Sequence, residues 1–145
     1  VFGPGHIDEE SPKLGKSKNA LELIDAEKVI CERKGLIVRP GGLIDQKRHP
    51  KRFLKKVSKI SKSESPVNLV HTADVASFLH FAIENNLTND SFNLVCNDHP
   101  SKEEFYSRFN LDCSFDPIDS QKRIISNLKS IEAGFIYQYP NLDWT

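Results

Sequence analysis

Apolar residues recur along the chain in helical and strand-like patterns that alternate. Helical spacing predicts helices over residues 17–33, 49–60, 73–86 and 102–109, and a last short helix that Ser126 caps and that stops at Gly134. Short apolar runs predict strands near 36–39, 67–70 and 92–95, and an edge strand near 115–118. Residues 4–15, rich in Gly, Pro and acid, are expected to form a loop. This order is typical of an α/β fold with a largely parallel sheet.

Local signals support the helices. Thr72 is the expected N-cap of the third helix, and Ser101 with Glu104 forms an expected capping box before the fourth. The first helix is expected to pack through one face, formed by Ala20, Leu23, Ile24, Glu27 and Ile30. The helix over 49–60 is expected to have an apolar stripe formed by Phe53, Leu54, Val57 and Ile60.

The three strands predicted near 36–39, 67–70 and 92–95 are too few for a doubly wound sheet. The chain also contains no Met, and Val1-Phe2-Gly3 resembles the end of a strand that runs into a turn. We therefore expect the rest of the sheet to lie upstream of Val1, so that the chain forms a single partial domain.

Composition favours a cytoplasmic globular protein. The 145 residues are 38% hydrophobic and 28% charged, with a formal net charge of zero, which does not favour nucleic acid or an anionic membrane as partner. No apolar run approaches the ~20 residues that span a bilayer, and no signal peptide is expected at the start. Cys31, Cys96 and Cys113 are expected to be reduced thiols.

An ordered set of motifs resembles the extended short-chain dehydrogenases/reductases, in particular the atypical nucleoside-diphosphate-sugar epimerase-like (YeeZ-like) subgroup. The motifs are Leu14-Gly-Lys-Ser-Lys18 with Ala20 and Glu22, Gly35-Leu-Ile-Val-Arg-Pro-Gly-Gly-Leu43, Arg48-His-Pro-Lys-Arg-Phe-Leu54, Asn68-Leu-Val-His-Thr-Ala-Asp-Val-Ala76, Phe92-Asn-Leu-Val-Cys-Asn-Asp-His-Pro100 with Glu104-Phe-Tyr106, Ser126-Asn127 through Gly134-Phe135, and Tyr139-Pro140. The resemblance covers nearly the whole chain.

The resemblance implies the C-terminal part of a Rossmann-like doubly wound parallel sheet with the small substrate-binding region of these enzymes. Residues 1–44 would end the Rossmann-like core and include the nicotinamide-side loop. Residues 45–145 would form the substrate-side region, interleaved with the last core strand and helices. The complete protein would bind NAD or NADP and a small-molecule substrate, and a homodimer is left open.

The catalytic tyrosine of the family is replaced here. In active relatives a tyrosine moves a proton, and a lysine four residues later lowers its pKa and binds the nicotinamide ribose. Leu14 occupies the tyrosine position and cannot carry a proton. Lys18 remains as the catalytic and cofactor-binding candidate, although a solvated lysine on a helix is an equally good interpretation.

The cofactor contacts implied by the resemblance lie at Pro40, Gly41, Gly42 and Leu43, where small residues let backbone N–H groups approach a carboxamide. An ordinary strand-to-loop turn is the alternative interpretation. The glycine-rich loop that holds dinucleotide pyrophosphate is absent, so the 145 residues alone are expected to bind NAD(P) weakly or not at all.

Three further residues are substrate-binding candidates. Residues 47–62 carry eight Lys or Arg and no acid. Such a basic segment is interpreted first as the charged outer face of a helix, second as a grip on an anionic substrate or a cofactor phosphate through His49 and Arg52, and last as a nucleic-acid surface. His71 ends a strand three residues before Asp74, and a structural role for that pair is favoured over acid–base chemistry. No metal site is expected.

Two functions follow as hypotheses. The first is an NAD(P)-binding oxidoreductase or epimerase-like protein that acts on a small polar or sugar-like substrate with an altered proton relay. The alternative is a non-catalytic dinucleotide-binding sensor or regulatory protein. A basic interaction module unrelated to a cofactor is a third, weaker hypothesis, because the ordered motifs argue against it.

Overall fold

The helices and strands alternate along the chain. The computed structural model describes residues 1–54, 57–109, 112–117 and 122–144. Its helices are α1 (Lys18–Glu32), α2 (Pro50–Phe53), α3 (Thr72–Glu84), α4 (Lys102–Ser107) and α5 (Leu128–Glu132). Its strands are β1 (Gly5–Ile7), β2 (Leu36–Pro40), β3 (Gly42–Ile44), β4 (Lys59–Ser61), β5 (Leu69–His71), β6 (Asp90–Leu94), β7 (Ser114–Asp116) and β8 (Arg123–Ile125).

All strand pairs in the described residues are parallel. β2 pairs with β6 over five residues, from Leu36 opposite Asp90 to Pro40 opposite Leu94. β1 pairs with β8, β3 with β5 and β4 with β7, over three residues each. The predicted α/β class with parallel strands is confirmed. The described residues form two-stranded pairs rather than one continuous doubly wound sheet.

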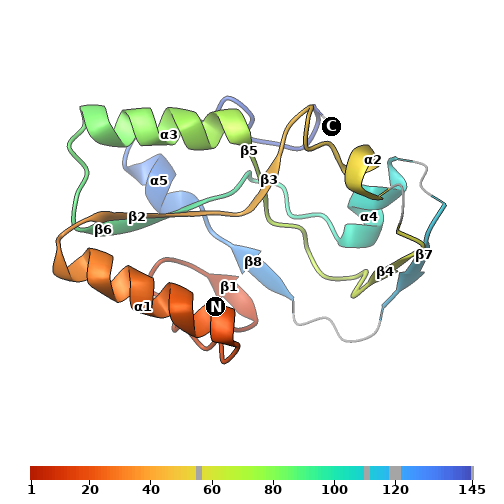
Figure 1. Ribbon diagram of the computed structural model, residues 1–145. Helices are drawn as coiled ribbons and strands as arrows, with labels where there is room; N and C mark the ends of the chain where they lie inside the picture. The colour runs from red at the N-terminus through yellow and green to blue at the C-terminus, as the bar shows by residue number, and fades with distance from the viewer. Residues whose placement is uncertain (55–56, 110–111, 118–121, 145) are drawn as a thin grey trace.

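Helices cover both faces of the longest strand pair. α1 lies on one side of β2 and β6, and α3 and α5 lie on the other (Figure 1). Between α3, α5 and the strands lies the main core, which contains Val70, Phe78, Ala82, Phe92, Leu94, Phe135 and Tyr137. The short elements α2, α4, β4 and β7 form the opposite end of the molecule (Figure 1). No helix of the described residues is long and apolar enough to cross a bilayer.

The predicted apolar face of α1 is only partly buried. Ala20 is buried, but Leu23 and Ile30 expose 58% and 40% of their surface. Ser17 caps the helix, and its Oγ accepts a hydrogen bond from the Ala20 N–H. Glu27, on the same face, is held by Arg39 of β2, so this face contributes an ion pair as well as apolar contacts.

The predicted helix over residues 49–60 is wrong in extent. His49 and Pro50 start a helix as expected, but α2 ends at Phe53, and Lys59–Ser61 form β4. Ile60 is buried and lies opposite Phe115 in the β4–β7 pair. Strand pairing with a distant segment has therefore overridden the local helical spacing. Residues 55 and 56 and the side chain of Phe53, which belonged to that prediction, lie outside the described residues.

Tertiary pairing also creates strands that the local pattern did not predict. β1 lies within the predicted loop over residues 4–15, and β3 lies within the predicted glycine turn. β8 was not predicted, because only two of its three residues, Ile124 and Ile125, are apolar. The predicted strand near 115–118 is β7, but Ile118 lies outside the described residues.

Two helix caps differ from the predictions. His71 instead of Thr72 caps α3, and Asn127 instead of Ser126 precedes α5. Ser126 Oγ nevertheless accepts a hydrogen bond from the Leu128 N–H. The predicted Ser101–Glu104 capping box is confirmed, with both reciprocal bonds present.

Candidate functional site

The chain changes strand partner at the predicted glycine pair. β2 ends at Pro40 beside β6, and β3 begins at Gly42 beside β5. A Cβ atom on Gly41 would lie 2.5 Å from the carbonyl oxygen of Asn68, so only glycine allows this approach. The Gly41 N–H donates to Leu94 O (2.9 Å), and the Gly42 N–H donates to Asn68 O (2.8 Å). Both predicted amide donors therefore bond within the protein.

Asn68 ties this partner change to β8. Its Nδ2 donates to Arg123 O (2.9 Å), and its Oδ1 accepts from the Ile125 N–H (2.8 Å). Arg123 in turn donates from Nε to Gly3 O (2.9 Å) and from Nη2 to Phe2 O (2.5 Å). The sequence analysis assigned no role to either residue. A lone amide between Val67 and Leu69 in an apolar run was the available signal for Asn68.

Leu14 packs beside Gly3, in the N-terminal segment that Arg123 also contacts. Its Cδ1 lies 3.1 Å from the position that a Cβ on Gly3 would occupy, and 60% of the residue is exposed. The following Gly15 N–H donates to Val1 O (2.6 Å). Leu14 thus lies beside Gly3, whose carbonyl oxygen accepts the hydrogen bond from Arg123 Nε. The position expected for a tyrosine is an exposed apolar surface.

Lys18 extends into solvent from the first turn of α1. Its side chain is 88% exposed, and its Nζ lies 3.9 Å from Glu22 Oε1, one helical turn away. A surface pair of this kind contributes little to stability. The side chain is therefore unconstrained and able to meet a ligand, which also fits the alternative interpretation as a solvated lysine.

A mainly apolar groove of about 400 Å³ lies between α1 and β2. Pro40 lines it together with Val1, Phe2, Leu23, Glu27, Val38, Arg39, Asn93 and Ile125. Asn93 is 1% exposed, and its Nδ2 has no hydrogen-bond partner among the described residues. An amide donor is costly to bury without an acceptor, so Asn93 Nδ2 would favour a hydrogen-bond acceptor in this groove.

A charge network borders the groove. Glu27 accepts two bonds from Arg39, from Nε to Oε1 (2.7 Å) and from Nη2 to Oε2 (2.9 Å), and Lys13 Nζ lies 2.6 Å from Oε2. Burial raises the pKa of Glu27, but the hydrogen bonds from Arg39 and Lys13 outweigh burial and hold that pKa below its ordinary value. Glu27 is thus fixed as a carboxylate.

His71 lies in a second pocket, of about 360 Å³, at the carboxyl ends of β3 and β5. Asp45, Gln46, Lys47 and Tyr139 complete its lining. The imidazole stacks on the Tyr139 ring with centroids 3.8 Å apart, and the Trp144 ring meets it edge-on at 4.6 Å. Ligands of α/β proteins commonly bind outside the carboxyl ends of parallel strands, so the location suits a substrate.

The hydrogen bonds fix the chemical state of this pocket. The Ala73 N–H donates to His71 Nδ1 (3.1 Å), so the neutral ring carries its proton on Nε2. Asp45 accepts from the Arg48 N–H (2.7 Å) and from the Thr72 hydroxyl (2.8 Å), and these bonds hold the pKa of Asp45 below its ordinary value. The pocket thus offers an imidazole donor, a carboxylate and the Lys47 ammonium.

Asp74 does not line the pocket that contains His71. It is fully buried, and its two oxygens accept the N–H groups of Gln138 (2.7 Å) and Tyr139 (3.1 Å). The favoured structural interpretation of the His71/Asp74 pair agrees with these bonds, because Asp74 anchors the C-terminal tail that carries Tyr139.

His49 and Arg52 lie on α2, away from the other candidates. His49 Nδ1 accepts from the Lys51 N–H (3.2 Å) and caps the helix, while its ring contacts Phe109 edge-on at 5.2 Å. Arg52 is exposed. The predicted site residues lie at four places in the fold: Lys18 in the first turn of α1, Pro40–Leu43 where β2 passes into β3, His71 at its pocket, and His49 with Arg52 at α2.

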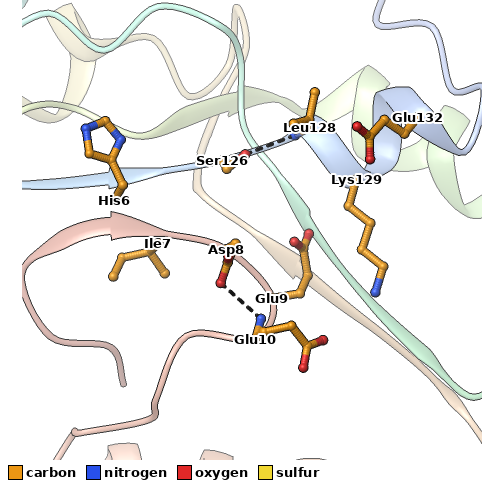
Figure 2. A pocket seen from close by; sticks show the side chains of 9 residues that line it. All are labelled: His6, Ile7, Asp8, Glu9, Glu10, Ser126, Leu128, Lys129 and Glu132. Atoms are coloured by element: carbon orange, nitrogen blue, oxygen red, sulfur yellow. Dashed lines mark hydrogen bonds between the residues drawn. The ribbon is translucent and has the colours of Figure 1, made fainter.

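The sequence analysis missed a third pocket, of about 580 Å³, beside the ends of β1 and β8. Figure 2 shows Glu9 and Glu10 extending from the loop after β1, and Lys129 from α5. Its other lining residues are His6, Ile7, Asp8, Ser126, Leu128 and Glu132. Glu9 is buried, and its Oε1 accepts the Asn93 N–H (2.6 Å), which ties this loop to β6. Among the described residues no group of three His, Cys, Asp or Glu is placed to hold a metal.

Comparison with known proteins confirms the resemblance to YeeZ-like proteins. The chain is 28% identical over 154 aligned residues to Protein YeeZ of Escherichia coli K12, and the alignment covers 97% of this chain and 56% of YeeZ. The chain thus spans about half the length of the curated relatives it matches. No family model matches the sequence.

Solved structures confirm the Rossmann-like epimerase fold. Human epimerase family protein SDR39U1 (isoform 2), solved with NADPH, has a TM-score of 0.77 at 17% identity, covering 97% of this chain and 59% of that protein. A conserved protein from Silicibacter pomeroyi has a TM-score of 0.79 at 18% identity with the same coverage. The dTDP-glucose 4,6-dehydratase of Bacillus anthracis, solved with NAD, has a TM-score of 0.74 at 13% identity, covering 96% and 54%.

Proposed function

We propose that this chain is the nicotinamide-side and substrate-side part of an NAD(P)-binding, epimerase-like protein that acts on a small polar or sugar-like substrate. The observation that carries the proposal is the agreement of nearly the whole chain with folds that were solved with NADPH or NAD bound. The partner change at Pro40–Gly42 lies at the carboxyl end of β2, which is where such folds bind ligands.

The proposed cofactor contacts are Lys18, Pro40, Gly41, Gly42 and Leu43. The Gly41 and Gly42 amides are already bonded within the protein, so neither would donate to the carboxamide. The two glycines would instead set the path of the loop backbone beside the nicotinamide ring, because Asn68 O and Leu69 Cδ2 leave no room for a side chain at either position. Lys18 would reach the ribose with its solvent-exposed ammonium. The bound cofactor would exchange a hydride with the substrate.

The proposed substrate contacts are His71, through its Nε2–H, and the basic residues His49 and Arg52. His71 is fixed in orientation by its bond to Ala73 and by Tyr139. A donor fixed by packing suits a hydroxyl or carbonyl oxygen of a sugar-like molecule. Lys47, in the same pocket, would favour substrates that carry negative charge.

Leu14 supports a second candidate function, a dinucleotide-binding sensor or regulatory protein without turnover. An exposed leucine offers no proton to a reacting oxygen. General acid–base help is worth roughly 10²–10⁴-fold in rate, so its loss makes ordinary dehydrogenase activity slow. Cofactor binding does not depend on this proton.

Substitutions at Lys18 and Leu14 test the two functions. They are made in a protein that has the full length of the matched relatives. Lys18→Ala is expected to weaken NADPH binding about tenfold or less, as measured by calorimetry. Lys16→Ala, an exposed lysine just before α1, is the matched control and should leave binding unchanged. Equal binding by both variants contradicts the proposed role of Lys18.

Leu14→Tyr is expected to leave the NADPH dissociation constant nearly unchanged. If the protein is an enzyme with a lost proton donor, this variant should raise turnover of an alcohol or sugar, by up to ~10²-fold. A variant that binds NADPH but shows no turnover supports the sensor. Fast turnover by the wild type that falls in Leu14→Tyr contradicts the vacant-tyrosine interpretation and places the proton on another residue.

A further inference from the structure

Exposed cations gather beside the pocket at the carboxyl ends of β3 and β5. Within six residues of the chain lie Lys47, Arg48, Lys51 and Arg52. None of their side chains forms an ion pair with a described residue. Lys47 lines the pocket, and the chain from Lys47 to the start of α2 at Pro50 spans at most roughly 11 Å. Like charges this close together raise the local positive potential, so this side of the pocket favours an anion.

Two other lining residues of the pocket are suited to hydroxyl groups. His71 Nδ1 accepts the Ala73 N–H (3.1 Å), which leaves the Nε2–H as a donor. The Asp45 carboxylate accepts the Thr72 hydroxyl (2.8 Å) and the Arg48 N–H (2.7 Å), and two carboxylate oxygens have lone pairs for further bonds. A hydroxyl group both donates and accepts, so neighbouring hydroxyls of a sugar or polyol can meet this donor and this carboxylate together.

The pocket is small, and its aromatic wall is held in place. Its volume of about 360 Å³ lies near the lower end of the ~300–1,000 Å³ that small-molecule sites usually have. Tyr139 lines it, stacks on His71 with centroids 3.8 Å apart, and donates its N–H to the buried Asp74 (3.1 Å). The pocket therefore suits a single sugar or polyol unit whose anionic group lies toward the basic segment.

We propose that this pocket binds the phosphomonoester of a sugar or polyol, with hydroxyls on Asp45 and His71 and the phosphate on Lys47 and the neighbouring cations. A phosphomonoester carries a charge of about −1.5 to −2 at pH 7 and three acceptor oxygens, so it can use several cations at once. A carboxylate carries only one charge, and a neutral sugar leaves the cations without a counter-charge. This inference rests on the proposed function, because the ligand is its substrate, and it narrows the class of that substrate.

Calorimetry on the protein with the full length of the matched relatives tests the ligand class. The probes are D-glucose 6-phosphate, D-fructose 6-phosphate and D-ribose 5-phosphate, each compared with inorganic phosphate and with its own unphosphorylated sugar. At least one sugar phosphate is expected to bind about tenfold or more tightly than both of its comparison compounds. The proposal is overturned if none of the three sugar phosphates meets both comparisons.

Two substitutions locate the two ends of the ligand. Lys47→Ala is expected to weaken binding of the sugar phosphate about tenfold, the usual effect of losing a bond to a charged group. Lys122→Ala, an exposed lysine that lines a different pocket, is the matched control and should bind like the wild type. Equal affinity of the Lys47→Ala and Lys122→Ala variants contradicts the phosphate contact.

His71→Asn keeps a side-chain acceptor for the Ala73 N–H and removes the Nε2–H donor. This variant is expected to weaken binding of the sugar phosphate about tenfold and to leave binding of inorganic phosphate unchanged. Equal losses for the sugar phosphate and for inorganic phosphate, or no loss for either, contradict the contact between His71 and the sugar.

NADPH distinguishes two sources of the phosphate, because its 2′-phosphate is also a phosphomonoester. The sugar phosphate is expected to bind protein saturated with NADPH at least as tightly as free protein. Displacement of the sugar phosphate by NADPH would assign the cations to the cofactor and overturn the proposal. A protein that binds NADPH but no sugar phosphate contradicts this ligand class alone, whereas a protein that does not bind NADPH contradicts the proposed function.

Discussion

At the scale of single residues, Glu27 links three parts of the chain. It joins α1 to β2 through Arg39, and to the loop before α1 through Lys13. Arg39 also donates to Glu9 O (3.3 Å), so the same guanidinium holds the loop after β1. A bidentate Arg–carboxylate pair is stronger than hydrogen bonds between neutral groups, and its two parallel bonds fix the geometry of both side chains.

Glu27→Gln is expected to lower the free energy of unfolding at pH 7 by about 1 kcal/mol, a value reduced for partial solvent screening. Because the pKa of Glu27 is depressed in the folded state, its contribution is complete above the ordinary glutamate value of ~4.3 and is lost as pH falls through the folded value. Urea unfolding at pH 7 and near pH 3 checks this. Glu22→Gln, whose partner Lys18 is 3.9 Å away and exposed, is the control. A difference between wild type and Glu27→Gln that persists at low pH would contradict the ionic explanation.

At the scale of elements, the contact between β3 and β5 depends on the lack of a side chain at Gly41. A Cβ there would meet the backbone oxygen of Asn68 at 2.5 Å and Val95 Cγ1 at 2.8 Å. At Gly3 the nearest atom is the end of the flexible Leu14 side chain at 3.1 Å. Backbone atoms within a strand pair move less easily than a side-chain methyl group.

Gly41→Ala is therefore expected to destabilise the protein by roughly 1–3 kcal/mol, the usual range for overpacking. Gly3→Ala should cost less than about 0.5 kcal/mol, because Leu14 can rotate away. Thermal unfolding of both variants against wild type checks the order. If the two substitutions cost the same, close packing is not the reason for glycine at position 41.

At the scale of the whole molecule, the C-terminal tail is fixed to α3 by one buried carboxylate. Asp74→Ala leaves the N–H groups of Gln138 and Tyr139 without an acceptor, and the expected loss is about 2–5 kcal/mol. Asp74→Asn keeps one acceptor and should lose less. Ser77→Ala, which removes an exposed 3.3 Å bond to Gln138 Nε2, should change stability little.

Fluorescence provides a direct measurement of this tail. Trp144 is the single tryptophan of the chain, and it contacts His71 and Tyr139. Release of the tail in Asp74→Ala is expected to shift Trp144 emission to longer wavelength before global unfolding in urea. Emission that changes only with global unfolding would show that Asp74 does not hold the tail separately.

The sequence alone determined the elements whose signals are local. α1, α3 and α4 follow from helical spacing, and the capping box that starts α4 at Ser101 needs only four neighbouring residues. β2, β5 and β6 follow from short apolar runs, although their ends differ by up to two residues from those predicted. The resemblance to YeeZ-like proteins was also readable from ordered motifs.

Tertiary structure alone decided everything that depends on distant partners. Residues 59–61 have helical spacing, yet they form β4 because Ile60 becomes buried beside Phe115. The sequence draws attention to the glycine pair, but only the fold shows that its amides bond to Leu94 and Asn68. Arg123 gains its contacts with Phe2 and Gly3 across more than a hundred residues. Local sequence encodes backbone preference, whereas strand partners and buried hydrogen bonds are chosen by the free energy of the assembled molecule.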